Sequence, residues 1–245
     1  MESKSTEYVY DNVIQIEDAV ASRKFIAKVF AWMFVALGIS ATCAFLFAAS
    51  PELSSLLRDS VTHQNTIFGT VAMFLPLVFV FISGAVFSRG SYLALALVFI
   101  GFSAAMGISL SNIFFFYPIT TISGVFITAS LVFGAMAIGG YITHQDLTKF
   151  GGILTMLLIG VIIASVINLL IFRSGTMDLI ISYVGVAVFT GLTAYDVQKL
   201  KRIGASAEVD GATKSKVSLM GALTLYLDFV NLFLMLLRIF GGNRR

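Results

Sequence analysis

Two acidic residues near the carboxyl end of the chain have the side chains whose chemistry most needs explaining. The first, Asp228, interrupts the apolar stretch LTLYLDFVNL, within a run predicted to cross a membrane over residues 217–240. At 1.5 Å per residue it lies about 16 Å from the start of that run, near the middle of a bilayer. An ionised aspartate at that depth costs about 2.5 to 3.5 kcal/mol, so we expect Asp228 to face protein or water rather than lipid.

The helical neighbours of Asp228 support an inward orientation. Gly221 and Thr224 precede it on the same helix face and Asn231 follows by about one turn, so the four residues form a small, polar stripe. We expect this stripe to face the protein interior. A buried, protonated and hydrogen-bonded aspartate with a purely structural role is the alternative.

The second acid, Asp196, closes the preceding predicted helix in the sequence GLTAYDVQKLKR. Thr193 lies about one turn before it and Lys199 about one turn after it. An ordinary surface pair of Asp196 with Lys199, which contributes a few tenths of a kcal/mol, is one interpretation. Because the two acids lie on consecutive helices, the other interpretation is a pair formed by Asp196 and Asp228.

A buried pair of carboxyl groups can act as a proton-controlled latch. Burial and like-charge repulsion both favour a form in which the pair shares one proton. With that proton, a hydrogen bond from carboxyl to carboxylate holds the latch closed; without it, Asp196 and Asp228 repel each other and attract a cation. Calcium prefers about six to eight oxygen ligands, so the two carboxylates would form a transient site rather than a store.

The elements that must position these acids are membrane-spanning helices. Of the 245 residues, 58% are hydrophobic and 12% are charged, whereas a soluble domain has about 45 to 50% apolar and about 25% charged residues. Continuous apolar runs of about 20 residues predict helices and not barrel strands. The predicted fold class is an all-α integral membrane protein with seven transmembrane helices. The predicted spans are residues 29–49, 67–87, 92–110, 119–142, 151–172, 179–200 and 217–240.

Three regions are predicted: a cytoplasmic tail (1–28), a membrane domain (29–242) and, within it, a long cytoplasmic loop (199–216). Most basic residues fall in the loops that this orientation places inside, in agreement with the positive-inside rule. Seven crossings would export the end of the chain with Arg238, against that rule. The last segment therefore either crosses regardless or enters the membrane and returns.

Other classes of function find little support in the sequence. His63 and His144 both fall in loops, and no set of serine, histidine and acid is visible within the spans, so we expect no enzyme and no cofactor. The spans have no mid-helix lysine for a retinal Schiff base. No basic stripe with aromatic residues suggests nucleic acid. Cys43, the single cysteine, excludes an intrachain disulfide.

The segments TAYDVQKLK and LYLDFVNLFLMLLR resemble the Bax inhibitor family (the transmembrane Bax inhibitor motif family), in its bacterial branch. The resemblance covers the layout from Lys24 to Gly242 and is sharpest over the last 100 or so residues. It implies a fold in which six helices surround a central seventh. It also implies a pair of aspartates acting in pH-sensitive calcium leak, at the positions of Asp196 and Asp228.

Two features depart from the family pattern. A basic residue proposed to contact the aspartates in the second span of relatives is missing from residues 67–87, although Arg58 and Arg89 flank that span. The predicted spans also place Asp196 about 10 Å shallower than Asp228. A pair then requires residues 217–220 to lie below the membrane core, or a water-filled cavity open to the cytoplasm.

The sequence therefore predicts a pH-sensitive calcium or cation leak channel in a bacterial plasma (inner) membrane, with a cytoplasmic N-terminus. Its partners would be the lipid bilayer and calcium or protons. The alternative is a non-conducting regulator that binds another membrane protein, such as a protease, or that modulates stress or cell death.

Overall fold

The computed structural model describes the backbone of residues 2–59, 62, 64–206 and 210–242, with side chains from residue 20 onward. These described residues form helices and no strand, apart from one isolated bridge between Arg58 and Asn65. The elements are α1 (Glu2–Ala49), α2 (Pro51–Leu57), α3 (Ile67–Arg89), α4 (Tyr92–Leu110), α5 (Ile113–Phe116), α6 (Ile119–Ile142), the 3-10 helix η1 (Leu147–Phe150), α7 (Gly151–Ile167), the π-helix η2 (Asn168–Phe172), α8 (Gly175–Ala205) and α9 (Gly211–Gly241).

Seven helical segments of the described chain are long and apolar enough to cross a membrane. Their outer surfaces carry many large apolar side chains; Phe81 is 78% exposed and Met156 is 74% exposed. A soluble protein rarely exposes such a continuous apolar surface, whereas lipid tails solvate it well. The predicted all-α fold class with seven spans is confirmed.

Polar side chains cap several of the helix starts. Each cap residue accepts a hydrogen bond from a backbone N–H in the first turn, which satisfies a donor that has no partner within the helix. The capping residues are Thr66 for α3, Ser91 for α4, Ser174 for α8 and Asp210 for α9. They stand where the chain turns between spans and so fix where each helix begins.

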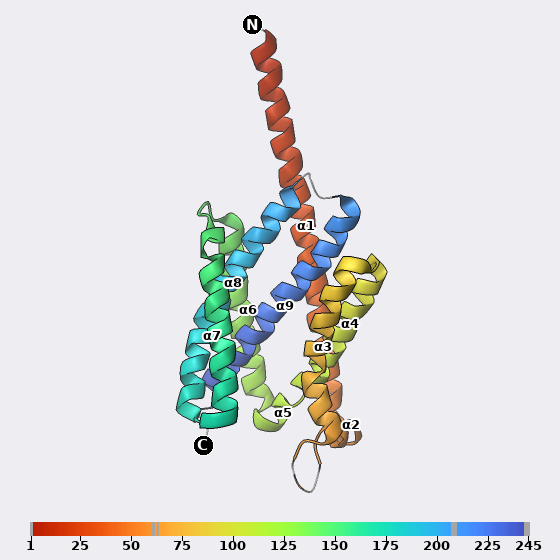
Figure 1. Cartoon of the computed structure of the whole chain (residues 1–245), viewed down its shortest axis with the longest axis vertical. Coiled ribbons are helices and arrows are strands. Elements are labelled where there is room, and N and C mark those ends of the chain that lie inside the picture. The colour runs from red at the N-terminus through yellow and green to blue at the C-terminus, as the bar shows by residue number, and fades with distance from the viewer. Residues whose placement is uncertain (1, 60–61, 63, 207–209, 243–245) are drawn as a thin grey trace.

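The two helices that carry the acids extend further than the predicted loop at 199–216 allows. Residues 199–205 belong to α8 and residues 211–216 belong to α9. Contacts of the basic side chains explain the extension: Lys201 Nζ donates to Tyr141 O at 2.7 Å, and Lys214 Nζ donates to Gly204 O at 3.4 Å. The predicted tail 1–28 is likewise helical from Glu2, and its first part projects beyond the bundle (Figure 1).

Helix α9 is the most buried span of the described chain. In its apolar window 72% of the residues are buried, against 11% to 44% in the other spans. It packs against α8, α1, α6, α4 and α3, while α7 packs mainly against α8. The arrangement of six helices around a seventh stays a prediction.

Glycines allow the close approach of α8 to its neighbours. A Cβ at Gly140 of α6 would overlap the backbone of Ala194 in α8, and a Cβ at Gly221 of α9 would come within 2.5 Å of Leu200 Cδ2. Both contacts lie within one turn or so of Asp196, so they set its position against α6 and α9. A Cβ would instead enter open space at four other glycines of α6 and α7, namely Gly134, Gly139, Gly152 and Gly160.

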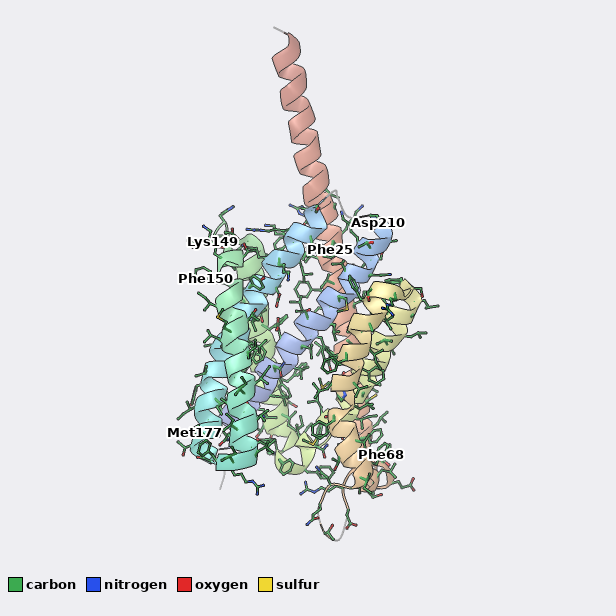
Figure 2. All side chains as sticks on the ribbon, viewed as in Figure 1. Phe25, Phe68, Lys149, Phe150, Met177 and Asp210 are labelled. Atoms are coloured by element: carbon green, nitrogen blue, oxygen red, sulfur yellow. The ribbon has the colours of Figure 1, made fainter. Side chains whose placement is uncertain are left out.

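The last helix crosses the whole bundle. Figure 2 places Lys149 and Asp210 at the end from which α1 emerges, and Met177 at the other end, toward which α9 runs (Figures 1 and 2). The alternative in which this segment enters and returns is therefore excluded. Arg238 near the far end of α9 pairs with Asp178 of α8, with 3.2 Å between Nη1 and Oδ1. This ion pair gives Arg238 a counter-charge at the far end of α9.

Candidate functional site

The structure brings Asp196 of α8 and Asp228 of α9 together. Their carboxyl groups lie close enough to act on each other by charge and within reach of a hydrogen bond. Both residues are buried, Asp196 at 9% and Asp228 at 5% exposure. Two acids separated by 32 positions in the sequence therefore form one site inside the helical bundle.

The tilt and extension of α9 explain how the two depths match. Asp196 lies about 14 Å along α8 from Ala205, whereas Asp228 lies about 26 Å along α9 from Gly211. Helix α9 crosses the bundle obliquely (Figure 1). Each residue of α9 therefore adds less depth along the bundle axis than a residue of an upright helix does. Residues 217–220 are an uninterrupted part of α9, and the 10 Å difference expected from parallel spans does not separate the carboxyl groups.

One oxygen of the pair has no hydrogen-bond partner. Asp228 Oδ2 is the only buried side-chain oxygen or nitrogen of the described residues in this condition. Nearly all buried polar atoms in proteins are paired, because an unpaired one loses its hydration without compensation. A proton or a cation at this oxygen would supply the missing partner.

Lys199 is the nearest charged group of opposite sign. It lies close enough to Asp196 to act on it electrostatically. Its ammonium group is exposed and sits over the ring of Tyr195, 5.9 Å from the centroid, and the described residues contain no ion pair between Lys199 and Asp196. The surface-pair interpretation of Asp196 is therefore wrong, because Asp196 points inward to Asp228 while Lys199 points outward.

The polar residues expected beside the acids do not bond to them. Thr193 is fully buried, but its hydroxyl donates to Phe189 O of its own helix at 2.8 Å. Thr224 donates to Met220 O and Asn231 donates to Leu227 O, again within one helix.

The expected inward orientation was wrong for Thr224, which is exposed, whereas Asn231 is half-buried and Asp228 is buried. The reason is that the apolar side of α9 packs against several helices and is the better buried one. The least buried face of α9 is instead a stripe at helical spacing, formed by Met220, Thr224, Leu227, Asn231, Leu234 and Arg238.

Neither of the two arginines that flank the second span, Arg58 and Arg89, takes the place of the basic residue that this span lacks. Arg58 sits over the rings of Phe115 and Phe116, at 5.4 and 5.1 Å from their centroids, beside the short helix α5. Arg89 ends α3 and is exposed. The apolar stretch between them carries no charge, so Lys199 of α8 is the cation that acts on the pair.

A second buried polar group was not predicted from the sequence. Ser40 of α1 donates to Ser103 O of α4 at 2.7 Å, and Tyr226 of α9 donates its phenolic proton to Ser40 Oγ at 2.7 Å. Tyr226 is fully buried and its ring packs edge-on against Phe102, with centroids 5.2 Å apart. Polar side chains inside apolar runs were the available signal. This group ties α1, α4 and α9 together two residues from Asp228.

Of the two histidines, the structure describes His144, which lies in a turn outside the spans that carry the pair. His144 follows α6 in the turn before η1, and Asp146 in the same turn caps η1 by accepting from Thr148 N at 3.1 Å. The hydroxyl and the backbone N–H of Thr148 both donate to Asp146 and lower the pKa of its carboxyl group below the ordinary value. His63 lies outside the described residues.

Fold and site together define a multi-pass helical membrane protein with two buried, mutually contacting aspartates in its last two spans. Residues 22–245 match the family model described as inhibitor of apoptosis-promoting Bax1. The chain is 40% identical over 235 residues to the inner membrane protein YbhL of Escherichia coli strain K12, which covers 96% of this chain and 97% of that one. It is 38% identical to an uncharacterized protein of Borreliella burgdorferi, covering 93% of this chain and 96% of the other. The chain belongs to the Bax inhibitor family.

Proposed function

We propose that this protein is a pH-sensitive leak channel for calcium, or for cations more broadly, gated by Asp196 and Asp228. The observation that carries the proposal is the contact between two buried carboxyl groups, one of which has an oxygen without a partner. A site in the inner membrane, with the N-terminus in the cytoplasm, agrees with the positions of the basic residues and with the similarity to the inner membrane protein YbhL.

Gating follows from the number of protons on the pair. With one proton, the carboxylic acid of one aspartate donates to the carboxylate of the other and holds α8 against α9. Without it, two negative charges lie at hydrogen-bonding distance in a poorly hydrated site, where their repulsion is several times stronger than in water. Besides the return of a proton, separation of the two helices or entry of a cation relieves this repulsion.

The surroundings give the pair no other counter-charge within the membrane. Helices α1 and α6 pack against α8 and α9, and α4 packs against α9. Residues 29–49 of α1, together with α4 and α6, contain no aspartate, glutamate, lysine or arginine. Lys199 on α8 is the cation that acts on Asp196. Tyr226, the nearest titratable residue on α9, is bonded to Ser40 of α1. The proton content of the two acids therefore dominates the local charge.

Calcium is the proposed permeant ion. Two carboxylates supply a minority of the six to eight oxygens that calcium prefers, so they would bind it briefly during transit. Within the described residues, no group of three or more histidine, cysteine, aspartate or glutamate side chains lies close enough together to hold a metal ion. We propose no enzymatic activity and no cofactor.

The test is calcium flux into proteoliposomes at pH 6 and pH 8. We expect flux through the parent to be larger at pH 8, because the doubly ionised pair opens. Asp196→Asn and Asp228→Asn cannot carry two negative charges, so their flux should no longer rise between these pH values. Asp178→Asn is the matched control, because it removes a carboxylate from the exposed far end of the same helix α8. Equal flux from all four proteins at both pH values overturns the proposal.

A non-conducting regulator that binds another membrane protein is the second candidate. One observation favours it: Thr224 and the half-buried Asn231 lie on the open face of α9 rather than against another helix of this chain. Polar side chains at such positions hydrogen-bond between helices in membranes. Proteoliposomes that show no flux at any pH, together with capture of a partner that Thr224→Leu and Asn231→Leu abolish, would establish this function instead.

A further inference from the structure

A basic cavity lies at the end of the bundle from which α1 emerges. It has a volume of about 300 Å³ and is lined by Ser22 of α1, Thr143 and His144 after α6, and Gln198, Lys201 and Arg202 of α8. Two cationic side chains thus line a hollow where α6 and α8 end beside α1.

Both cations are held in place and retain donors. Lys201 Nζ donates one hydrogen bond to Tyr141 O, and it lies 4.8 Å from the centroid of the Tyr141 ring. Arg202 Nη2 lies 2.8 Å from Asp146 Oδ1, and Arg202 Nη1 donates to Thr148. An ammonium has three N–H donors and a guanidinium has five, so an anion in the cavity still finds several.

An apolar groove lies between α1 and α6, two of the helices that border the cavity. Its volume is about 390 Å³, and Met33 and Phe133 are buried in it beside Phe229 of α9. Phe34 of α1 and Phe126 of α6 stand at its edges and are 67% and 41% exposed. Helices α1 and α6 each pack against α8 and α9 rather than closely against each other, so the groove opens toward the lipid.

Two glycines keep this groove open. Gly38 on α1 and Gly134 on α6 both line it, and a Cβ added at either position would meet no atom within 4 Å. Larger side chains at these positions would fill the groove without disturbing the packing of the helices.

The cavity and the groove have the spacing of a phospholipid. Ser22 in the cavity and Phe30 in the groove are about 12 Å apart along α1. The headgroup layer on one side of a bilayer is about 6 Å thick and half of the hydrocarbon core is about 15 Å thick, so a point 12 Å below a headgroup lies among the acyl chains of that leaflet. Charged groups above an apolar groove complement both parts of one molecule.

We propose that this protein binds one anionic phospholipid of the adjoining leaflet, with its phosphate between Lys201 and Arg202 and one acyl chain in the groove between α1 and α6. Basic pockets between transmembrane helices on the cytoplasmic side bind anionic headgroups in this way. The site is separate from the aspartate pair, and its occupancy does not depend on channel activity.

The test is native mass spectrometry of the full chain in detergent with equal amounts of phosphatidylglycerol and phosphatidylcholine that carry the same acyl chains. We expect one phosphatidylglycerol per chain to be retained in preference to phosphatidylcholine. Lys201→Gln with Arg202→Gln should weaken phosphatidylglycerol binding by about fivefold per charge removed. The charge-matched control Lys149→Gln with Arg89→Gln alters two exposed cations outside the cavity and should retain the preference.

The groove is tested independently of charge. Gly38→Leu and Gly134→Leu should reduce retention of both lipids. The control is Gly139→Leu, which also enters open space on α6 but lies outside the groove. Thermal unfolding of each variant identifies any that fail to fold, and the lipid preference of the parent stands as a test without them.

Three outcomes overturn the proposal. The first is equal retention of the two lipids by the parent. The second is displacement of phosphatidylglycerol by inorganic phosphate at equal concentration, which would make the cavity a site for a soluble anion. The third is unchanged retention in the folded groove variants.

Discussion

The contact between Gly140 of α6 and Ala194 of α8 supports a quantitative prediction. A Cβ at position 140 would overlap backbone atoms of Ala194, which cannot move aside as a side chain would. Overpacking of this kind typically costs about 1 to 3 kcal/mol. Replacing glycine by alanine inside a helix also stabilises that helix by about 0.5 to 1 kcal/mol. Gly140→Ala should therefore change the free energy of unfolding by a net loss of between about 0 and 2.5 kcal/mol.

A matched variant separates these two contributions. Gly139→Ala lies on the same helix and gains the same helix propensity, but its Cβ enters open space. The difference between the variants should equal the overpacking cost of about 1 to 3 kcal/mol, with Gly140→Ala the less stable. Reversible unfolding in mixed micelles measures it. Because Ala194 is two residues from Asp196, Gly140→Ala should also alter the pH dependence of calcium flux, and Gly139→Ala should not. Equal stabilities of the two variants would refute the close packing of α6 on α8.

Two further predictions concern other polar contacts. Tyr226→Phe removes one interhelical hydrogen bond and should lower the free energy of unfolding by about 0.6 to 1.7 kcal/mol. Ser40→Ala leaves the Tyr226 hydroxyl buried without a partner and should lower it by more, about 1 to 3 kcal/mol. The reverse order of the two losses would contradict Tyr226 as the donor. The Thr148 hydroxyl and backbone N–H hold the pKa of Asp146 below its ordinary value of 3.8. The ionised Asp146 carboxylate therefore stabilises the folded protein above that pH, and this stabilisation is lost as the pH falls through the lowered pKa. Asp146→Asn should therefore lower stability at pH 6 and have little effect at pH 2, as measured by chemical denaturation; an equal effect at both pH values would contradict this.

The number and class of the helices could be predicted from the sequence, because lipid requires every span to satisfy its own backbone hydrogen bonds and to present apolar side chains. The seven apolar runs therefore specify seven helices almost directly. The ends of α8 and α9 could not be predicted in the same way. Their extension beyond the apolar runs depends on tertiary contacts such as those of Lys201 and Lys214 with backbone carbonyls.

The candidate site could likewise be predicted only in part from the sequence. The cost of a mid-membrane carboxylate pointed to Asp228, and the neighbouring helix supplied Asp196 as a partner. Helix periodicity alone could not tell that Thr224 faces outward. Thr224 and Asp228 differ by only about 40° around the helix, and which side is covered depends on where α8, α1 and α6 pack. The bond between Ser40 and Tyr226 joins residues 186 positions apart, which no local pattern reveals.

The central claim is that Asp196 and Asp228 act as one proton-binding unit. A double-mutant cycle tests it most directly, with calcium flux at pH 6 and pH 8 measured for the parent, Asp196→Asn, Asp228→Asn and the protein with both substitutions. We predict that either single substitution abolishes the rise in flux with pH and that the second adds nothing. Effects of the two substitutions that simply add, or a single variant that keeps the full pH response of the parent, would contradict the claim.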